Sequence, residues 1–188
     1  MRQVEQSPIG IWSGELDDET CDRIIVEGQL LEQEKATVYG DKTVDTTIRD
    51  NVVGWFPRDS WVDRLLFYYA HTTNELNNWN FNINDREQTQ FTTYGEGDFY
   101  KWHRDCSIKS DIYRKLSITV QLSNTNDYSG GEFRLKDCWG NNEIDITERG
   151  MKRGTILVFP SFLLHQVEPI RSGMRYSLVQ WYSGPPFT

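Results

Sequence analysis

Hydrophobic and polar residues alternate most regularly at positions 114–123, where Leu116, Ile118, Val120 and Leu122 are separated by single polar residues. Alternation with a period of two is typical of a β-strand with one apolar face. Short apolar segments separated by turn-forming residues continue from there to position 182. They predict further strands at 132–135, 143–146, 154–159, 162–167 and 174–182, with turns at 124–131 and 168–173.

Helical periodicity is found only in the first half of the chain. Residues 15–31 are predicted to form a helix, because Asp17 is a favourable N-cap and Cys21 begins an apolar stripe. A second helix is predicted at 60–77, with Ser60 as its cap. Shorter strands are predicted around 9–12 and at 51–56, 79–83 and 89–94, whereas the polar segment 32–50 predicts a mobile surface loop.

Two helices followed by many short strands with regularly spaced turns indicate a β-sandwich or barrel. We therefore predict a mainly β jelly roll whose N-terminal α-helices pack on one outer sheet. The sequence contains no internal repeat, linker or low-complexity segment. Residues 1–188 are accordingly predicted to form a single catalytic domain, with a helical lead-in at about 15–83 and a jelly-roll core at about 86–182.

The net charge of −8 at pH 7 argues against nucleic acid as a partner, because phosphate recognition requires a basic surface. The three cysteines cannot all pair within the chain and none forms a C-x-x-C motif, which favours a reducing compartment. The N-terminus lacks an apolar signal region, and no apolar run is long enough to span a membrane. We expect a soluble, cytoplasmic protein with no membrane partner.

Candidate metal ligands stand at His103 and Asp105, one residue apart. In an extended strand, residues two positions apart point to the same face, so the imidazole and the carboxylate converge. His165, on a later predicted strand, would complete the two-histidine, one-carboxylate set that binds non-haem Fe(II) and leaves three coordination positions open. The alternative is a hydrogen-bonded His–Asp pair on an exposed strand end. His71 lies within the second predicted helix, where a structural or surface role is expected.

Arg175 follows His165 by ten residues and begins the last predicted strand. A guanidinium binds a carboxylate through two directional hydrogen bonds, so this arginine is suited to a small dicarboxylate. Ser177 shares a strand face with Arg175 and could add a hydrogen bond to the same carboxylate. The alternative is a surface arginine paired with a glutamate.

These residues together resemble the Fe(II)/2-oxoglutarate-dependent dioxygenases, and more closely the prolyl 4-hydroxylase type. The resemblance covers most of residues 15–182, and the combination of motifs is more specific than any one of them. It rests on the HRD motif at 103–105, His165, Arg175, the Tyr94-Gly95 lead-in with Tyr100, the Gly130-Gly131-Glu132-Phe133 turn, and the aromatic Trp181 six residues after Arg175.

The resemblance implies a double-stranded β-helix, the cupin-like form of the jelly roll, with a metal at its open end. In it His103, Asp105 and His165 would bind Fe(II), and Arg175 would bind the 5-carboxylate of 2-oxoglutarate. Tyr94 would contact the cosubstrate or line its pocket. A tyrosine that binds the cosubstrate in oxygen-sensing members is replaced here by Gln121, which implies that the polar face of strand 114–123 points inward. An ordinary half-buried strand with that face in solvent is the alternative.

The implied reaction is hydroxylation of a C–H bond with O₂ and 2-oxoglutarate, releasing succinate and CO₂, with ascorbate as a possible reductant. The carboxylate at position 105 favours hydroxylation over the halogenation that related enzymes without it perform. The substrate would be a peptide, a protein or an amino acid, with proline as the leading expectation. Residues expected to border the open end and meet the substrate are Tyr100, Trp181, Arg49 and Trp55.

Two other functions remain open from the sequence. One is a jelly-roll module that binds a ligand or a partner protein without turnover. The other is a cupin-type enzyme that uses the same metal triad without 2-oxoglutarate, in which case Arg175 would be dispensable.

Overall fold

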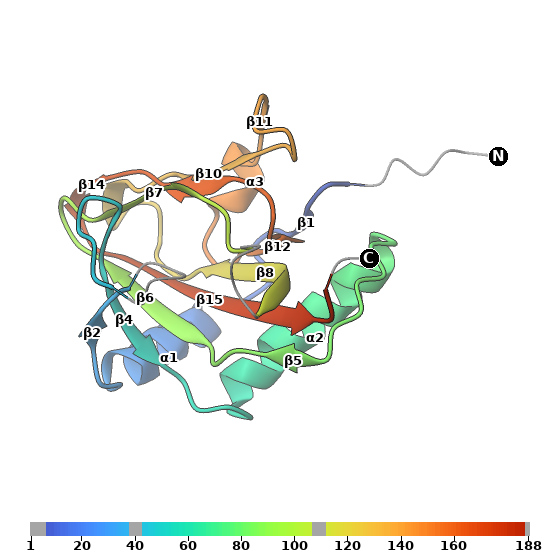
Figure 1. The fold of residues 1–188 in the computed structure, drawn as a ribbon. Coiled ribbons are helices and arrows are strands. Elements are labelled where there is room, and N and C mark those ends of the chain that lie inside the picture. Colours follow the sequence, from blue (N-terminus) through green and yellow to red (C-terminus); the bar gives the residue numbers. More distant parts are fainter. Residues whose placement is uncertain (1–6, 38–42, 107–111, 187–188) are drawn as a thin grey trace.

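The computed structural model describes residues 7–37, 43–106 and 112–186. Two antiparallel β-sheets lie face to face, and the two long helices cover the outer face of the larger sheet (Figure 1). This confirms the predicted mainly β jelly roll with helices on one outer sheet. No helix in the described part of the chain is both long enough and apolar enough to cross a membrane.

The larger sheet has eight strands and runs through the middle of the molecule. Its central strand β15 (Arg175–Gly184) pairs with β8 (Tyr113–Gln121) on one side and β6 (Gln90–Tyr94) on the other. The outer members are β12 (Ile156–Pro160) and β1 (Gly10–Trp12) beyond β8, β4 (Val52–Trp55) and β2 (Glu34–Lys35) beyond β6, and β5 (Asp85–Arg86) on β15.

The smaller sheet has five strands in the order β11-β10-β13-β7-β3. Its members are β11 (Glu143–Ile144), β10 (Phe133–Lys136), β13 (His165–Val167), β7 (Phe99–His103) and β3 (Arg49–Asp50). A separate ribbon joins β9 (Tyr128–Gly130) to β14 (Ile170–Gly173), and a short helix α3 (Thr147–Gly150) precedes β12.

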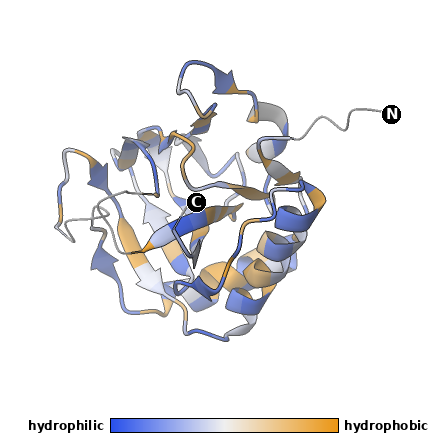
Figure 2. Cartoon of the chain, turned by 45° about the vertical axis from the view of Figure 1, so that its right-hand side comes forward, coloured by the Kyte–Doolittle hydropathy of each residue, from blue (hydrophilic) through white to orange (hydrophobic). Residues whose placement is uncertain are grey.

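The two faces of β8 differ as the alternation in the sequence predicts. Its apolar residues join the helices in one hydrophobic cluster, in which Leu116 and Ile118 are fully buried. Its polar residues Ser117, Thr119 and Gln121 are also buried, because that face lies inside the molecule. The inward orientation is therefore correct, and the alternative with these residues in solvent is wrong. Figure 2 shows the matching hydrophobic stretches on the helices and neighbouring strands.

Both long helices begin where their capping residues predict. The Asp17 side chain accepts a hydrogen bond from the Thr20 backbone N–H at the start of α1 (Asp18–Gln29). The Ser60 side chain does the same for the N–H of Asp63 at the start of α2 (Trp61–Leu76). Gly28 sits against Phe91, where a Cβ atom would come within 2.4 Å of the ring, so close packing of helix on sheet explains a glycine there.

Three predicted elements differ in the structure. No strand forms at 79–83, because Asn78 and Asn80 adopt positive φ angles of 54° and 52°, which extended backbone does not allow. The segment 32–50 is not one loop: it contains β2 and ends in β3, while positions 38–42 lie outside the described residues. The turn predicted at 168–173 is largely the strand β14, which pairs with β9.

Candidate metal and cosubstrate site

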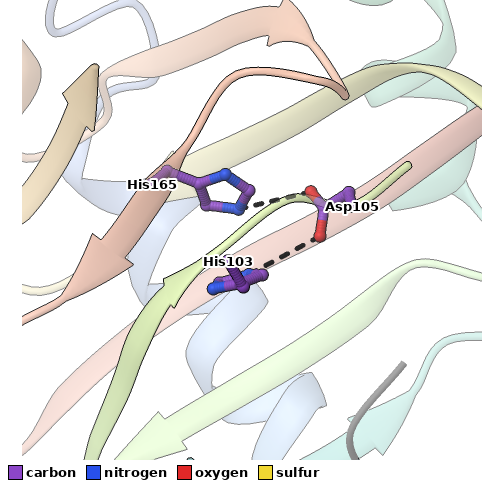
Figure 3. A group of neighbouring side chains, drawn as sticks. All are labelled: His103, Asp105 and His165. Carbon is purple, nitrogen blue, oxygen red and sulfur yellow. Dashed lines mark ion pairs between the residues drawn. The ribbon is translucent and has the colours of Figure 1, made fainter. Parts of the chain in front are cut away.

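His103, Asp105 and His165 meet between the two sheets (Figure 3). His103 ends β7, His165 begins β13, and the two residues face each other across the paired strands. Their candidate ligand atoms and a carboxylate oxygen of Asp105 all lie within 4.8 Å of one another. The Nε2 atoms of His103 and His165 lie 3.6 and 3.3 Å from Asp105 Oδ1 and Oδ2. Asp105 lies just beyond the end of β7, and its backbone N–H donates to the Ser161 carbonyl.

Backbone carbonyls orient both imidazoles. Nδ1 of His103 lies 2.7 Å from the carbonyl oxygen of Lys101, and Nδ1 of His165 lies 3.0 Å from that of Leu163. A carbonyl only accepts, so each Nδ1 carries the proton and each Nε2 keeps a lone pair that faces Asp105. Both histidines therefore present the nitrogen that a metal ion needs.

One hydroxyl group holds the Asp105 carboxylate, and a second hydroxyl group contacts the first. Ser117 Oγ donates to Asp105 Oδ2 over 2.6 Å, and Ser161 Oγ lies 3.0 Å from Ser117 Oγ. All three residues are buried. Such contacts hold a ligating carboxylate in one orientation before a metal arrives.

The protonation states suit a divalent cation. Burial, assisted by the nearby His165, lowers the pKa of His103 to about 4. Burial disfavours an ionised Asp105, but the neighbouring imidazoles outweigh it and hold the pKa of that carboxyl well below its usual value. At neutral pH His103 is thus neutral and Asp105 ionised, which are the forms that coordinate a metal.

Arg175 lies in the same pocket, where β15 and β6 pair. Its side chain is buried beside Tyr94, which is its cross-strand partner, with the guanidinium carbon 5.5 Å from the ring centre. Nη1 donates to Ser177 Oγ over 3.3 Å, while the buried Nε has no acceptor among the described residues. No carboxylate of the described residues pairs with Arg175, so the expected alternative of a surface Arg–Glu pair is wrong.

The unsatisfied guanidinium and the triad together fit 2-oxoglutarate and a metal ion. A buried arginine with free N–H donors is suited to a carboxylate that arrives with a ligand. The two imidazole nitrogens and the carboxylate oxygen form the donor set preferred by non-haem Fe(II). His103, Asp105 and His165 would hold the metal, and Arg175 with Ser177 would hold the far carboxylate of the cosubstrate.

The pocket also takes in Tyr100, Trp181 and Arg49, which the sequence places at the open end. Trp55 does not line it. That residue stands on β4, one strand further from the metal triad than β6, and its indole N–H donates to Glu34.

Gln121 is buried opposite Ser177, but it does not line the pocket either. Its side-chain amide donates to the Tyr128 hydroxyl over 2.7 Å, and its Oε1 has no partner among the described residues. A contact between Gln121 and the cosubstrate stays a prediction. His71 lies on α2 against Phe67 and Tyr182, outside the pocket, in keeping with a structural role.

Several lining residues escape motif analysis because they carry no metal-binding or acid–base group. Thr119 shares the inward face of β8 with Ser117, so the alternation of that strand is the signal that points to it. Gln90 shares a strand face with Tyr94 in the same way. The remaining lining residues are Phe133, Phe159, Val167 and Val179, which only the meeting of the two sheets brings together.

Comparison with known proteins agrees with this geometry. A family model described as the 2OG-Fe(II) oxygenase superfamily matches residues 89–183, a little over half of the chain. The chain belongs to this superfamily. The matched region contains all three residues of the triad and Arg175. Fe(II) and 2-oxoglutarate, for which the superfamily is named, are the groups that the donor set and the unsatisfied arginine fit.

Curated relatives are named PKHD-type hydroxylases. One from Shewanella oneidensis is 36% identical over 95 residues, which is 48% of this chain and 40% of the relative. One from Synechococcus sp. (strain CC9902) is 40% identical over 85 residues, covering 45% of this chain and 36% of the relative. The chain therefore matches well under half the length of these relatives.

Solved structures share the fold along nearly the whole chain. A prolyl-4-hydroxylase from Pseudomonas putida superposes with a TM-score of 0.68 at 23% identity, covering 94% of this chain and 93% of that one. The viral collagen prolyl hydroxylase of Paramecium Bursaria Chlorella virus-1 gives 0.69 at 18% identity, covering 97% and 99%. At such low sequence identity the similarity shows that this chain and the two hydroxylases share the same fold.

Proposed function

We propose that this protein is an Fe(II)- and 2-oxoglutarate-dependent dioxygenase that hydroxylates a C–H bond of a prolyl or other amino-acid residue. The observation that carries the proposal is one pocket that joins a preorganised His–Asp–His triad to a buried arginine with no acidic partner among the described residues. When bound, iron and 2-oxoglutarate supply the dioxygen chemistry that replaces a substrate hydrogen with hydroxyl, releasing succinate and CO₂.

The protein's own contribution is to bind the metal and the cosubstrate, to orient them, and to exclude water. His103, Asp105 and His165 would hold the metal through three ligand atoms, and a set of three leaves coordination positions for other ligands. Arg175 and Ser177 would bind the far carboxylate of 2-oxoglutarate in the pocket that the triad also lines. Phe133, Phe159 and Val167 form an apolar wall beside the triad, which keeps bulk water out and strengthens these charge interactions.

Prolyl and other amino-acid substrates are favoured by the names of the relatives and of the structural neighbours, which is an argument from analogy. One neighbour, from Trichoplax adhaerens, is a prolyl hydroxylase in complex with a peptide fragment. Trp181 lines the pocket and offers aromatic surface against which a small ring could pack, whereas the Tyr100 ring already contacts the His103 imidazole and the Arg49 guanidinium.

Anaerobic titration with Fe(II) and then 2-oxoglutarate tests the proposal. We expect a weak visible absorption band when both are bound, followed on exposure to oxygen by succinate release that a proline-containing peptide or a free amino acid stimulates. His103→Ala should abolish the band, because one of three protein ligands is lost. His71→Ala is the matched control, since that imidazole lies outside the pocket.

Two results would overturn the proposal. A folded protein that gives no band with either ligand, or a band that survives in His103→Ala, removes the metal assignment. Full activity in Arg175→Ala would favour instead a cupin-type enzyme that does not use 2-oxoglutarate, and binding without succinate formation would favour a module without turnover.

A further inference from the structure

Arg49 is a second buried arginine in the pocket, and the cosubstrate does not account for it. Its side chain is 6% exposed and lines the same cavity as the triad and Arg175. No carboxylate in the described part of the chain pairs with it: its Nε donates to the Asn51 side-chain oxygen over 2.7 Å and its Nη1 to the Thr37 carbonyl over 3.2 Å. Both acceptors are neutral, so the positive charge of Arg49 is not compensated.

The position of Arg49 is set by the smaller sheet. Arg49 on β3 is the cross-strand partner of Tyr100 on β7, and its guanidinium carbon lies 4.6 Å from the centre of that ring. The Tyr100 ring in turn stacks on the His103 imidazole at 3.4 Å. Arg49 is thus joined to a candidate metal ligand through one aromatic ring, which places its charge close to the place where substrate would bind.

The charges of the loaded pocket leave Arg49 without a counterion. Among the lining residues Arg49, Arg175 and Asp105 carry a charge, and an imidazole that binds a metal is neutral. A divalent metal and the 2-oxoglutarate dianion balance each other, and Asp105 balances Arg175. One positive charge remains, and an unpaired charge in a buried site is costly unless an anion arrives.

The pocket also contains buried hydrogen-bond donors that have no acceptor among the described residues. Two of the five N–H groups of Arg49 donate to Asn51 and Thr37, and within the described residues no acceptor is assigned to the other three. The buried indole Nε1 of Trp181, another lining residue, has no acceptor among the described residues. A ligand that brings acceptor oxygens would satisfy these donors.

We propose that Arg49 binds a carboxylate of the primary substrate, so that the substrate class is a carboxylate-bearing amino acid or peptide. The α-carboxylate of a free amino acid and the acidic side chain of a peptide share this chemistry. The inference rests on the proposed function, because it assigns 2-oxoglutarate to Arg175 and the substrate to Arg49. A neutral internal peptide segment would leave the charge unpaired.

The test compares acids with their neutral amides on protein loaded with Mn(II) and the inert cosubstrate analogue N-oxalylglycine. The probes are L-proline against L-prolinamide, and a proline peptide with a flanking Asp against the same peptide with Asn. Binding is followed by tryptophan fluorescence. We expect the wild type to prefer the acid in at least one pair by roughly tenfold or more, as for a charged hydrogen-bonded pair. The pair that shows the preference distinguishes the two sources of the carboxylate.

Three variants separate charge from structure. Arg49→Gln should reduce the acid preference to less than about threefold, whereas Arg49→Lys keeps the charge and should retain part of it. Asn51→Asp leaves the arginine and its hydrogen bond in place but neutralises it, so it should also remove the preference. Arg23→Gln is the matched control, since Arg23 also lies over an aromatic ring, that of Trp61, but on the exposed side of α1.

The outcomes distinguish a failure of this inference from a failure of the proposed function on which it rests. All variants should bind N-oxalylglycine with affinities within about threefold of wild type, because Arg175 is intact. Wild-type protein that binds N-oxalylglycine but shows no acid preference, including no binding of either form at millimolar concentration, contradicts the role of Arg49 alone. A preference that survives in both Arg49→Gln and Asn51→Asp contradicts it as well. Loss of N-oxalylglycine binding in Arg49→Gln would assign Arg49 to the cosubstrate instead.

Discussion

Each of the two sheets contributes one arginine–tyrosine pair to the pocket, and the two pairs have the same construction. On the larger sheet Arg175 faces Tyr94 across β15 and β6, and on the smaller sheet Arg49 faces Tyr100 across β3 and β7. In both, the guanidinium lies over the ring of its cross-strand partner. In both, the arginine is buried and has no acidic partner among the described residues.

The pairs differ in what surrounds them. Arg175 has one weak contact with a hydroxyl group and a buried Nε without an acceptor, so it is prepared for a ligand that enters deep into the barrel. Arg49 is held by Asn51 and Thr37, and its ring partner Tyr100 stacks on a candidate metal ligand. In the proposed assignment the larger sheet would hold the cosubstrate, while the smaller sheet would hold the metal and face the substrate.

The largest expected effect on activity comes from removing a candidate metal ligand. Asp105→Ala should reduce succinate formation by roughly a thousandfold or more, because loss of a ligand removes several kcal/mol of stabilisation. Turnover at saturating Fe(II) and 2-oxoglutarate measures it. Asp98→Ala is a control carboxylate outside the pocket, since Asp98 accepts a hydrogen bond from the Gly95 backbone. Wild-type turnover in Asp105→Ala would show that the smaller sheet does not hold the metal.

Acid should destabilise the metal-free protein through His103. Its pKa in the folded state is about 4 against an ordinary value near 6.5, so the unfolded chain takes up a proton first as the pH falls. The free energy of unfolding should drop between about pH 6.5 and 4, by on the order of 3 kcal/mol. Urea denaturation in the presence of a chelator measures this.

His103→Gln isolates the contribution of that histidine. Burial also lowers the pKa of His71, so part of the pH dependence should remain in the variant. A slope identical to wild type between pH 6.5 and 4 would mean that His103 is protonated as easily in the folded protein as in the unfolded chain.

Arg175→Gln should weaken 2-oxoglutarate binding by roughly a hundredfold, because a buried charge-assisted contact worth about 1.5–3 kcal/mol is lost. Fe(II) affinity measured without cosubstrate should change little. Arg171→Gln is the control, since Arg171 is exposed on β14 and pairs with Glu132. If Arg49→Gln weakened 2-oxoglutarate binding more than Arg175→Gln, the assignment of the two pairs would be reversed.

Ser117→Ala should have the smallest of these effects, a loss of about tenfold in Fe(II) affinity. The hydroxyl holds Asp105 Oδ2, and without it the carboxylate is free to rotate. Metal titration monitored by the absorption of the 2-oxoglutarate complex measures the change. Ser129→Ala removes an exposed hydroxyl that pairs with the Ser172 hydroxyl, far from Asp105 in the sequence and outside the pocket, and it should have no effect. Equal affinities for both variants would show that Ser161 and the backbone suffice to hold Asp105.

Most of the secondary structure near the site could be predicted from local patterns. The caps at Asp17 and Ser60 and the alternation of β8 are local signals, because each depends on residues within a few positions of one another. The missing strand at 79–83 and the additional strand β14 could not be predicted in this way. At 79–83 the backbone turns at Asn78 and Asn80 instead of extending. The strand β14 pairs with β9, which lies about forty residues earlier in the sequence.

The sequence by itself indicated the chemistry of the site: the candidate triad, the arginine ten residues after His165, and the two distinct faces of β8. Residue type and short-range spacing are enough for this, because a ligand's donor atoms and a strand's two faces are local properties. Only the tertiary structure decided which residues surround that chemistry. It separated Arg49, which pairing of β3 with β7 brings into the lining as expected, from Trp55 and Gln121, which do not line the pocket. Pairing between strands distant in the sequence sets those positions, and a local pattern does not say which distant strands become neighbours.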